Sequence, residues 1–289
     1  MPIRKCFKSN SMMADVFRRF LKNKLALISL MILCVIVLSA VFANLIVPYN
    51  KAISQDIVNK LQPPSMQHWF GTDQFGRDVF ARILYGTRIS LLIGVCTTAG
   101  ALLISGFLGS VAGYYGGRVD NIIMRLMDVL MCIPAILLAM TVIATLGQSI
   151  QNMIIAIGIS QISGFCRIIR SVILNLKGMD FIEAAKSCGA RDGRIILTHI
   201  IPNAIGPIIV QCSMNIAVSI IGAASLSFIG LGVSPPTPEW GIMLSEAKDH
   251  MRTAPYLSTI PGIAIVVTAL SFNLLGDGLR DALDPRLKD

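Results

Sequence analysis

Long apolar runs that carry no charge limit what this chain can fold into. The first extends from Leu25 to Val47, and several others approach the same length. About 20 apolar residues in a helix cross the hydrocarbon core of a bilayer, and a helix satisfies its backbone hydrogen bonds internally. Only 14% of the residues are charged, whereas soluble domains average about 25%. The sequence therefore predicts an all-α, polytopic membrane protein.

Six transmembrane helices are expected, with polar segments between them. The first apolar run is too long for a signal peptide, whose core has about 7–15 residues, so it is interpreted as a retained span. The expected division is a basic segment 1–24, a first span 25–47, an outer segment 48–88, a core 89–276 that includes a loop 166–203 and an outer segment 230–257, and a tail 277–289.

The positive charges indicate the orientation of these spans. Of the 25 Lys and Arg residues, 18 fall in segments that the six-span division places on the cytoplasmic side. Cytoplasmic loops carry an excess of Lys and Arg, so both termini are predicted to be cytoplasmic. The net charge of +9 is thereby assigned to topology and lipid contact, and no nucleic-acid partner is predicted. None of the seven cysteines lies in an expected outer segment, so no disulfide framework is predicted.

The polar stretch from Asp180 to Asn203 separates two apolar runs and predicts two short helices. Asp180 and Glu183 have the spacing of a capping box. Gly189 stands where a left-handed residue would end the first helix. Asp192 is expected to cap a second helix, which Pro202 stops. This hairpin of short helices suits docking onto a partner outside the membrane, and a well-capped ordinary loop is the alternative.

Few polar residues interrupt the expected spans. Gln211 and Asn215 lie at i and i+4 in the fifth span, 204–229. They either hydrogen-bond to another helix, which is the commoner arrangement, or line an aqueous path.

Two features of the second and third spans concern packing. Gly109 and Gly113 have the spacing that favours close contact between membrane helices. Arg125 and Asp128 are expected to pair with each other near one end of the third span, in which Pro134 predicts a kink.

The two expected outer segments carry distinctive motifs. His68 to Asp78 reads HWFGTDQFGRD, but its His and Asp spacing matches no metal-ligand template, so no metal is predicted. In the other segment, prolines precede Glu239-Trp240-Gly241 and an expected amphipathic helix, 242–251. By itself this segment is interpreted as a lid or plug.

Catalytic chemistry is not expected of this chain. It contains no G-x-x-x-x-G-K-[ST] phosphate loop, so it should not hydrolyse ATP. An intramembrane protease would need partners for Ser160 or Asp128, and neither has one at a convincing spacing. An autonomous channel or secondary carrier is also disfavoured, because carriers need ionisable groups near the membrane midplane.

The order Glu183-Ala184-Ala185, then Gly189, then a helix ending at Pro202 resembles the EAA loop of permease subunits in binding-protein-dependent ABC importers. The His68–Asp78 motif and the GLGVSPPTPEWG stretch resemble one branch, the C-type permeases of dipeptide, oligopeptide and nickel importers. The resemblance covers nearly the whole chain and implies a type I ABC importer permease fold in the bacterial inner membrane. It also implies a heterodimer with a second permease, two ATP-binding subunits that bind ATP and magnesium, and an extracytoplasmic binding protein.

The same resemblance assigns roles to particular residues. The residues implied to couple the permease to the ATPases are Asp180, Glu183, Ala184, Ala185, Gly189 and Pro202. Those implied to belong to the outer gate are Pro236, Glu239 and Trp240, and Gln211 and Asn215 are candidates for the translocation path. Dipeptides or oligopeptides are the expected cargo; nickel or metal chelates, glutathione and antimicrobial peptides are the alternatives within the family.

Overall fold

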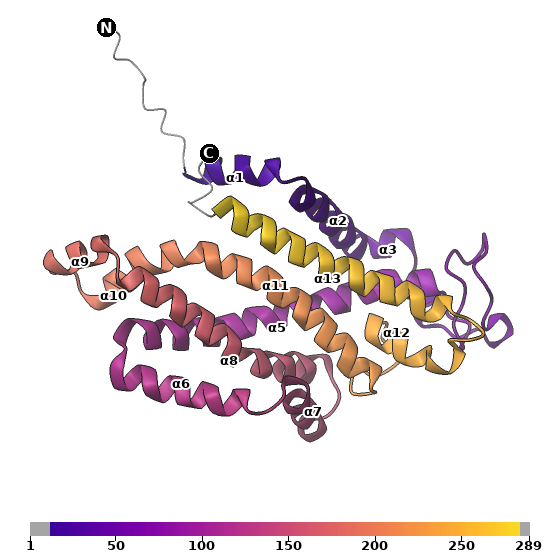
Figure 1. The fold of residues 1–289 in the computed structure, drawn as a ribbon. Helices are drawn as coiled ribbons and strands as arrows, with labels where there is room; N and C mark the ends of the chain where they lie inside the picture. The colour runs from indigo at the N-terminus through magenta and orange to yellow at the C-terminus, as the bar shows by residue number, and fades with distance from the viewer. Residues whose placement is uncertain (1–11, 284–289) are drawn as a thin grey trace, which may run out of the picture.

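The computed structural model describes residues 12–283, which form an elongated helical bundle (Figure 1). Within this range, five helices have the length and composition to cross a membrane, and the count is six when one bent pair is taken as a single span. The expected all-α fold with six spans is therefore confirmed. The crossing helices are α2 (Lys24–Val41), α5 (Val79–Tyr115), α6 (Gly117–Met131) with α7 (Ala135–Leu146), α8 (Ile150–Lys177), α11 (Ile201–Phe228) and α13 (Tyr256–Leu283).

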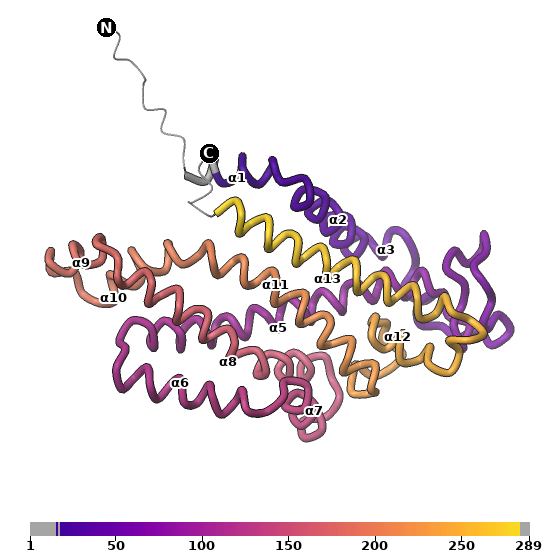
Figure 2. Tube along the Cα trace, viewed as in Figure 1, coloured from indigo at the N-terminus to yellow at the C-terminus, as the bar shows by residue number. Residues whose placement is uncertain are grey.

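Shorter helices lie at the two ends of the bundle (Figure 2). One end carries α9 and α10 and is called the hairpin end; the other carries α12 and residues 48–78 and is called the α12 end. The short helices are α1 (Met12–Lys22), α3 (Ala43–Ile46), α4 (Asn50–Ile53), η1 (Ile57–Asn59), α9 (Asp180–Ser187), α10 (Asp192–Ile195), η2 (Ile196–Ile200), α12 (Trp240–Glu246) and η3 (Lys248–His250).

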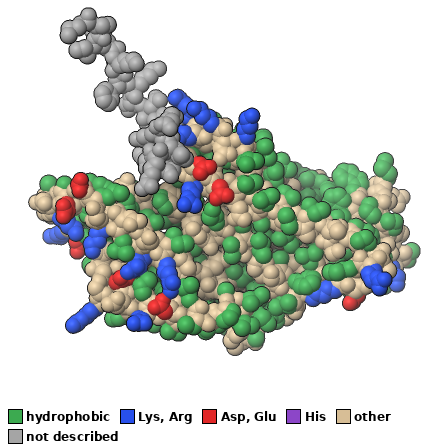
Figure 3. All heavy atoms as spheres, viewed as in Figure 1, with side chains coloured by type: hydrophobic (Ala, Val, Ile, Leu, Met, Phe, Trp, Pro, Cys, Tyr) green, Lys and Arg blue, Asp and Glu red, His purple; other side chains and the backbone are tan. Residues whose placement is uncertain are grey.

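Charged side chains gather toward the two ends of the bundle on the face drawn in Figure 3, and the band between them is largely apolar. Many large apolar side chains of the crossing helices are exposed, among them Val35, Leu103, Ile122 and Val266. An exposed apolar band between polar ends suits the hydrocarbon core of a bilayer.

Helix α5 begins ten residues before the expected start of the second span, Ile89. The Asp78 side chain accepts a hydrogen bond from the backbone N–H of Ala81 at 2.9 Å and so caps the helix. Arg88, which was expected to end the outer segment, lies inside α5 and donates to backbone carbonyls at the end of α2, including that of Val41 at 2.9 Å. The Asp78 cap and the hydrogen bonds of Arg88 to these carbonyls allow α5 to begin before the apolar run, among charged residues.

The expected close contact through Gly109 and Gly113 is confirmed between α5 and α8. A Cβ atom added at Gly109 would lie 2.8 Å from the carbonyl oxygen of Cys166, and one at Gly113 would lie 2.8 Å from the Cβ of Ile173. Glycine at these two positions therefore allows the helix axes to approach closely.

Gly113→Ala is expected to lower the free energy of unfolding by about 1–3 kcal/mol, because the added methyl group overpacks the contact with Ile173. Gly106→Ala is the matched control, since its added Cβ has no neighbouring atom within 4 Å in residues 12–283. Unfolding of the purified transporter in mixed detergent micelles measures both variants. Equal losses at the two positions would contradict the close contact.

The third crossing is broken rather than only kinked at Pro134. Helices α6 and α7 meet at 82°, and Pro134 itself is extended with ψ 130°. The expected pairing of Arg125 with Asp128 is wrong, because Asp128 accepts from Arg167 of α8 at 2.5 Å. A second arginine of α8, Arg170, pairs with Asp120. Helix α8 runs beside α6, and its arginines reach these carboxylates.

Candidate functional site

Helix α9 forms the exposed tip of the hairpin end (Figure 1). It begins at Asp180, Met179 occupies the N-cap position, and no side chain caps it. The predicted capping box of Asp180 and Glu183 is therefore wrong. The predicted end of the helix is confirmed: Gly189 has φ +79°, its N–H donates to the carbonyl of Lys186 at 2.8 Å, and the N–H of Ala190 donates to that of Ala185 at 3.1 Å. These two bonds form a Schellman motif.

The hairpin is anchored to the bundle on one side. Ile182 of α9 and Ile195 of α10 are fully buried in a cluster that includes Tyr114 of α5 and Ile173 of α8. The Tyr114 hydroxyl donates to Asp192 at 2.6 Å. Asp192 therefore does not cap α10 as expected; Arg191 occupies that position, without a side-chain bond. The Asp192 carboxylate instead fixes the hairpin to the end of α5.

Pro202 does not end the second helix of the hairpin as expected. The chain continues through Pro202 into α11, which carries the proline in its first turn. The preceding residues, Ile196–Ile200, form one π-helical segment. Proline lacks an N–H and clashes with the carbonyl four residues earlier. A locally wider helix relieves this clash, so the hairpin is joined directly to a crossing helix.

The other side of α9 is free. Glu183, Ala184 and Gly189 are exposed and Ala185 is half-buried. Because Ala184, Ala185 and Gly189 are small, a partner's backbone can approach α9 closely. Of the six predicted coupling residues, the structure therefore brings Asp180, Glu183, Ala184, Ala185 and Gly189 together at the tip, and it places the exposed Pro202 at the junction with α11.

The two path candidates have different surroundings. Gln211 lines a cavity of about 440 Å³ between α8, α11 and α13. Asn215 donates through Nδ2 to the backbone carbonyl of Gln211 at 2.9 Å, within its own helix. The hydrogen bonds between helices in this region are made by other residues: Gln161 of α8 donates to Ser219 of α11 at 2.9 Å, and Ser219 also contacts Thr98 of α5 at 3.2 Å.

At the opposite end, α12 is embedded among the crossing helices. Glu239 is 1% exposed, and its carboxylate accepts from the backbone N–H groups of Gly241 at 2.8 Å and Ile242 at 2.9 Å. Trp240 is also buried and donates to the carbonyl of Ile83 in α5 at 3.3 Å. Pro236 is exposed and follows Pro235 through a cis peptide bond. The helix expected at 242–251 instead spans Trp240–Glu246, because Glu239 caps its start, and η3 follows it at Lys248–His250.

Burial raises the pKa of Glu239 above its usual value near 4.5, because burial disfavours the charged carboxylate, although hydrogen bonds from Gly241 and Ile242 oppose the rise. The folded protein therefore binds this proton more tightly than the unfolded chain. This proton makes its full contribution to the free energy of unfolding below about pH 4.5, and the contribution is lost as pH rises through the raised pKa of Glu239. In Glu239→Gln this part of the pH dependence should disappear when unfolding is measured across the range. The same decline in the variant would contradict the assignment.

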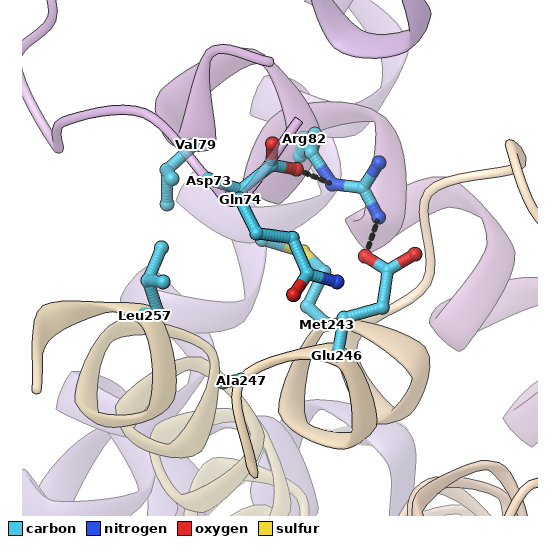
Figure 4. A pocket seen from close by; sticks show the side chains of 8 residues that line it. All are labelled: Asp73, Gln74, Val79, Arg82, Met243, Glu246, Ala247 and Leu257. Carbon is cyan, nitrogen blue, oxygen red and sulfur yellow. Dashed lines mark hydrogen bonds and ion pairs between the residues drawn. The ribbon is translucent and has the colours of Figure 1, made fainter. Parts of the chain in front are cut away.

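A cluster of four charges joins residues 48–78 to α12. Arg77 and Arg82 are 2% and 1% exposed. Arg77 donates to Asp73 and to Glu246, both at 2.6 Å, and Arg82 donates to Glu246 at 2.9 Å. Figure 4 shows Arg82 between Asp73 and Glu246, beside a cavity of only about 10 Å³, which is room for one water molecule. The sequence patterns did not predict this cluster. The local signal that could have indicated it is the spacing of Asp73 and Arg77, which are four residues apart.

The residues first considered as metal ligands have structural roles. His68 Nδ1 lies 2.8 Å from Asp78, the residue that caps α5. In the described range, 12–283, no group of three or more His, Cys, Asp or Glu residues is placed to hold a metal ion.

Solved structures show which class of protein has this fold. An inward-facing structure of the MetNI methionine ABC transporter superimposes with a TM-score of 0.59 at 14% identity, covering 70% of this chain and 97% of that one. A crystal structure of an amino acid ABC transporter with histidines has a TM-score of 0.51 at 17% identity, covering 65% and 87%. The chain thus shares the fold found in these two ABC transporter structures.

The chain belongs to the family of binding-protein-dependent transport system inner membrane components, whose model matches residues 105–289. Residues 11–64 match a second model, the N-terminal TM domain of oligopeptide transport permease C. Similar proteins include the dipeptide transport system permease protein of Alkalihalophilus pseudofirmus, 46% identical over 95% of this chain and 90% of that protein. The glutathione transport system permease protein of Pectobacterium atrosepticum is also 46% identical, over 95% and 91%.

Proposed function

We propose that this chain is the permease subunit of an ATP-driven importer in the bacterial inner membrane, and that it translocates dipeptides or oligopeptides. The observation that carries the proposal is the hairpin end. It combines a free surface of small residues on α9 with a buried, hydrogen-bonded attachment to the crossing helices. Such a surface suits a partner that pushes on the bundle from outside the membrane.

The partners follow from the class of transporter. We assign the hairpin end to the cytoplasm, where two ATP-binding subunits would bind ATP and magnesium and dock on Glu183, Ala184, Ala185 and Gly189. A second permease would complete the translocation path as a heterodimer. The α12 end would then face the extracytoplasmic binding protein that delivers the cargo, with Glu239 and Trp240 holding the outer gate.

The connections between the helices support a mechanical role for the hairpin. Helix α10 is joined to α5 through the bond between Tyr114 and Asp192, and the chain continues from the hairpin into α11 through the π-helical segment. Movement of the hairpin would therefore move α5 and α11 together. Rigid-body movement of packed helices between two arrangements is a general way to open a site alternately to the two sides of a membrane.

The proposed cargo rests on the relatives. One is named for dipeptide transport and another for glutathione transport, at nearly equal identity to this chain. Glutathione is itself a tripeptide, so small peptides are the shared class. Nickel, metal chelates and antimicrobial peptides are the remaining candidates within the family.

The test is uptake of labelled dialanine into vesicles that contain the reconstituted transporter with its binding protein. Uptake should require ATP and should stop when the phosphate-loop lysine of the ATP-binding subunits is replaced. Uptake by the permease pair alone, without ATP-binding subunits, would instead indicate a channel or an ion-driven carrier.

A further inference from the structure

The cavity at Gln211 lies in the half of the bundle toward the hairpin end. It has a volume of about 440 Å³, within the roughly 300–1,000 Å³ typical of small-molecule sites. Apolar side chains from three helices form most of its wall, including Ile168 of α8, Met214 of α11 and Leu283 of α13. Gln211 and Arg280 are the polar side chains that line it. A mostly apolar wall with two convergent polar groups is the usual composition of a ligand site.

Arg280 has no partner within the described range, 12–283. It makes no ion pair or hydrogen bond there, although two acids lie near it in α13. Asp281 instead accepts a hydrogen bond from Asn23 of α2 at 3.4 Å, and Asp277 lies outside the cavity lining. No acceptor within residues 12–283 therefore occupies the five N–H donors of the guanidinium. Their planar fork matches the two oxygens of a carboxylate.

Other arginines in the crossing helices differ from Arg280. Arg88 also lines a cavity, between α2 and α5, but it already donates to backbone carbonyls of α2. Arg167 and Arg170 are paired with Asp128 and Asp120. These side chains are held in structural bonds, whereas Arg280 combines a cavity with unused donors.

We propose that Arg280 and Gln211 form a transient site for the terminal carboxylate of the transported solute. The inference rests on the proposed function and narrows its cargo to small solutes that bear a carboxylate. An unblocked peptide always meets this condition at neutral pH, because its terminal carboxyl has a pKa of about 3.3–3.7. Gln211 can donate to the same carboxylate or accept from a peptide N–H. The apolar wall contacts the side chains without selecting among them.

The arrangement also favours release. Arg280 is exposed rather than buried, so water competes for its donors and the bond to a carboxylate is weakened. A pathway needs sites that are favourable enough to enter and weak enough to leave. One exposed guanidinium group in an apolar cavity meets both conditions.

The experiment compares labelled dialanine with its C-terminal amide, using vesicles that contain the complete transporter. Initial uptake by Arg280→Gln is divided by wild-type uptake for each compound, so the preference of the binding protein cancels. We expect a fall of about tenfold for dialanine, equivalent to about 1.4 kcal/mol, and no fall for the amide. Arg280→Lys, which keeps the charge but loses the fork, should give an intermediate ratio.

Two further measurements keep the outcome decisive. Arg118→Gln is the matched control, because Arg118 is exposed at the start of α6, away from the cavity. Copurification of the ATP-binding subunits shows that each variant assembles. Equal losses of uptake for dialanine and its amide, or no loss for either, would overturn the carboxylate site without contradicting the proposed import of peptides. If the wild-type transporter imported neither compound, the proposed function would fail as well.

Discussion

Glu246→Gln is expected to lower the free energy of unfolding of the transporter by about 3–5 kcal/mol, the cost of breaking a buried ion pair by removing one partner. The substitution keeps the size of the side chain and removes its charge. Arg77 and Arg82, both almost fully buried, would then share only Asp73. The excess positive charge has no other carboxylate in the cluster, so the α12 end should loosen first.

The matched control is Asp249→Asn, which removes a nearby acid that is exposed. Unfolding in mixed detergent micelles gives the global effect, and limited proteolysis of residues 48–78 reports on the α12 end. The double variant Arg82→Gln/Glu246→Gln restores the charge balance of Asp73 with Arg77, so it should recover part of the loss. Wild-type stability in Glu246→Gln would show that the four charges do not hold the α12 end together.

Local patterns in the sequence were enough to predict the membrane architecture. Uninterrupted apolar runs predicted the crossings, and the spacing of Gly109 and Gly113 predicted a close helix contact, because both depend on neighbouring residues. The left-handed Gly189 belongs to the same group. These features are set by hydrophobicity and backbone sterics within a few turns of helix.

Features that depend on distant residues could not be predicted. Arg77 and Glu246 are 169 residues apart in the chain, and only the packing of α12 against α5 reveals their pairing. Asp192 resembled a helix cap until Tyr114, 78 residues earlier, was found to be its partner. Pro202 resembled a helix stop, but an adjacent π-helical segment absorbs it. In each case tertiary contacts outweighed a local rule.

The two ends of the molecule are built for different mechanical tasks. At the α12 end, buried charges and the Glu239 cap hold the segment that precedes α5 against the segment that follows α11. At the hairpin end, only one side of α9 is buried and the tip is open. A rigid end and an end with a free docking surface are what a bundle needs if an external force is to tilt its helices as bodies.

Gly189→Asn is expected to reduce ATP-dependent uptake at least tenfold, with the fold intact. Asparagine accepts the left-handed conformation that Gly189 adopts at φ +79°. An added Cβ at Gly189 meets no atom of the described residues within 4 Å. The substitution should therefore preserve the turn and place a side chain where we propose that the ATP-binding subunit approaches. A loss of docking of about 1.4 kcal/mol corresponds to a tenfold fall in affinity.

Gly230→Asn is the matched control. Gly230 also has positive φ, +90°, and follows α11 with the same pair of hydrogen bonds, to Ser227 and from Leu231 to Leu226, but it lies at the opposite end of the bundle. Uptake into vesicles and copurification of the ATP-binding subunits measure both variants. Gly189→Ala separates strain in the turn from obstruction of the docking surface. Alanine strains the left-handed conformation by about 1–2 kcal/mol but adds only a methyl group to the surface. If Gly189→Asn imported normally and Gly189→Ala did not, Gly189 would serve the turn alone and the docking surface would have to lie elsewhere on the hairpin.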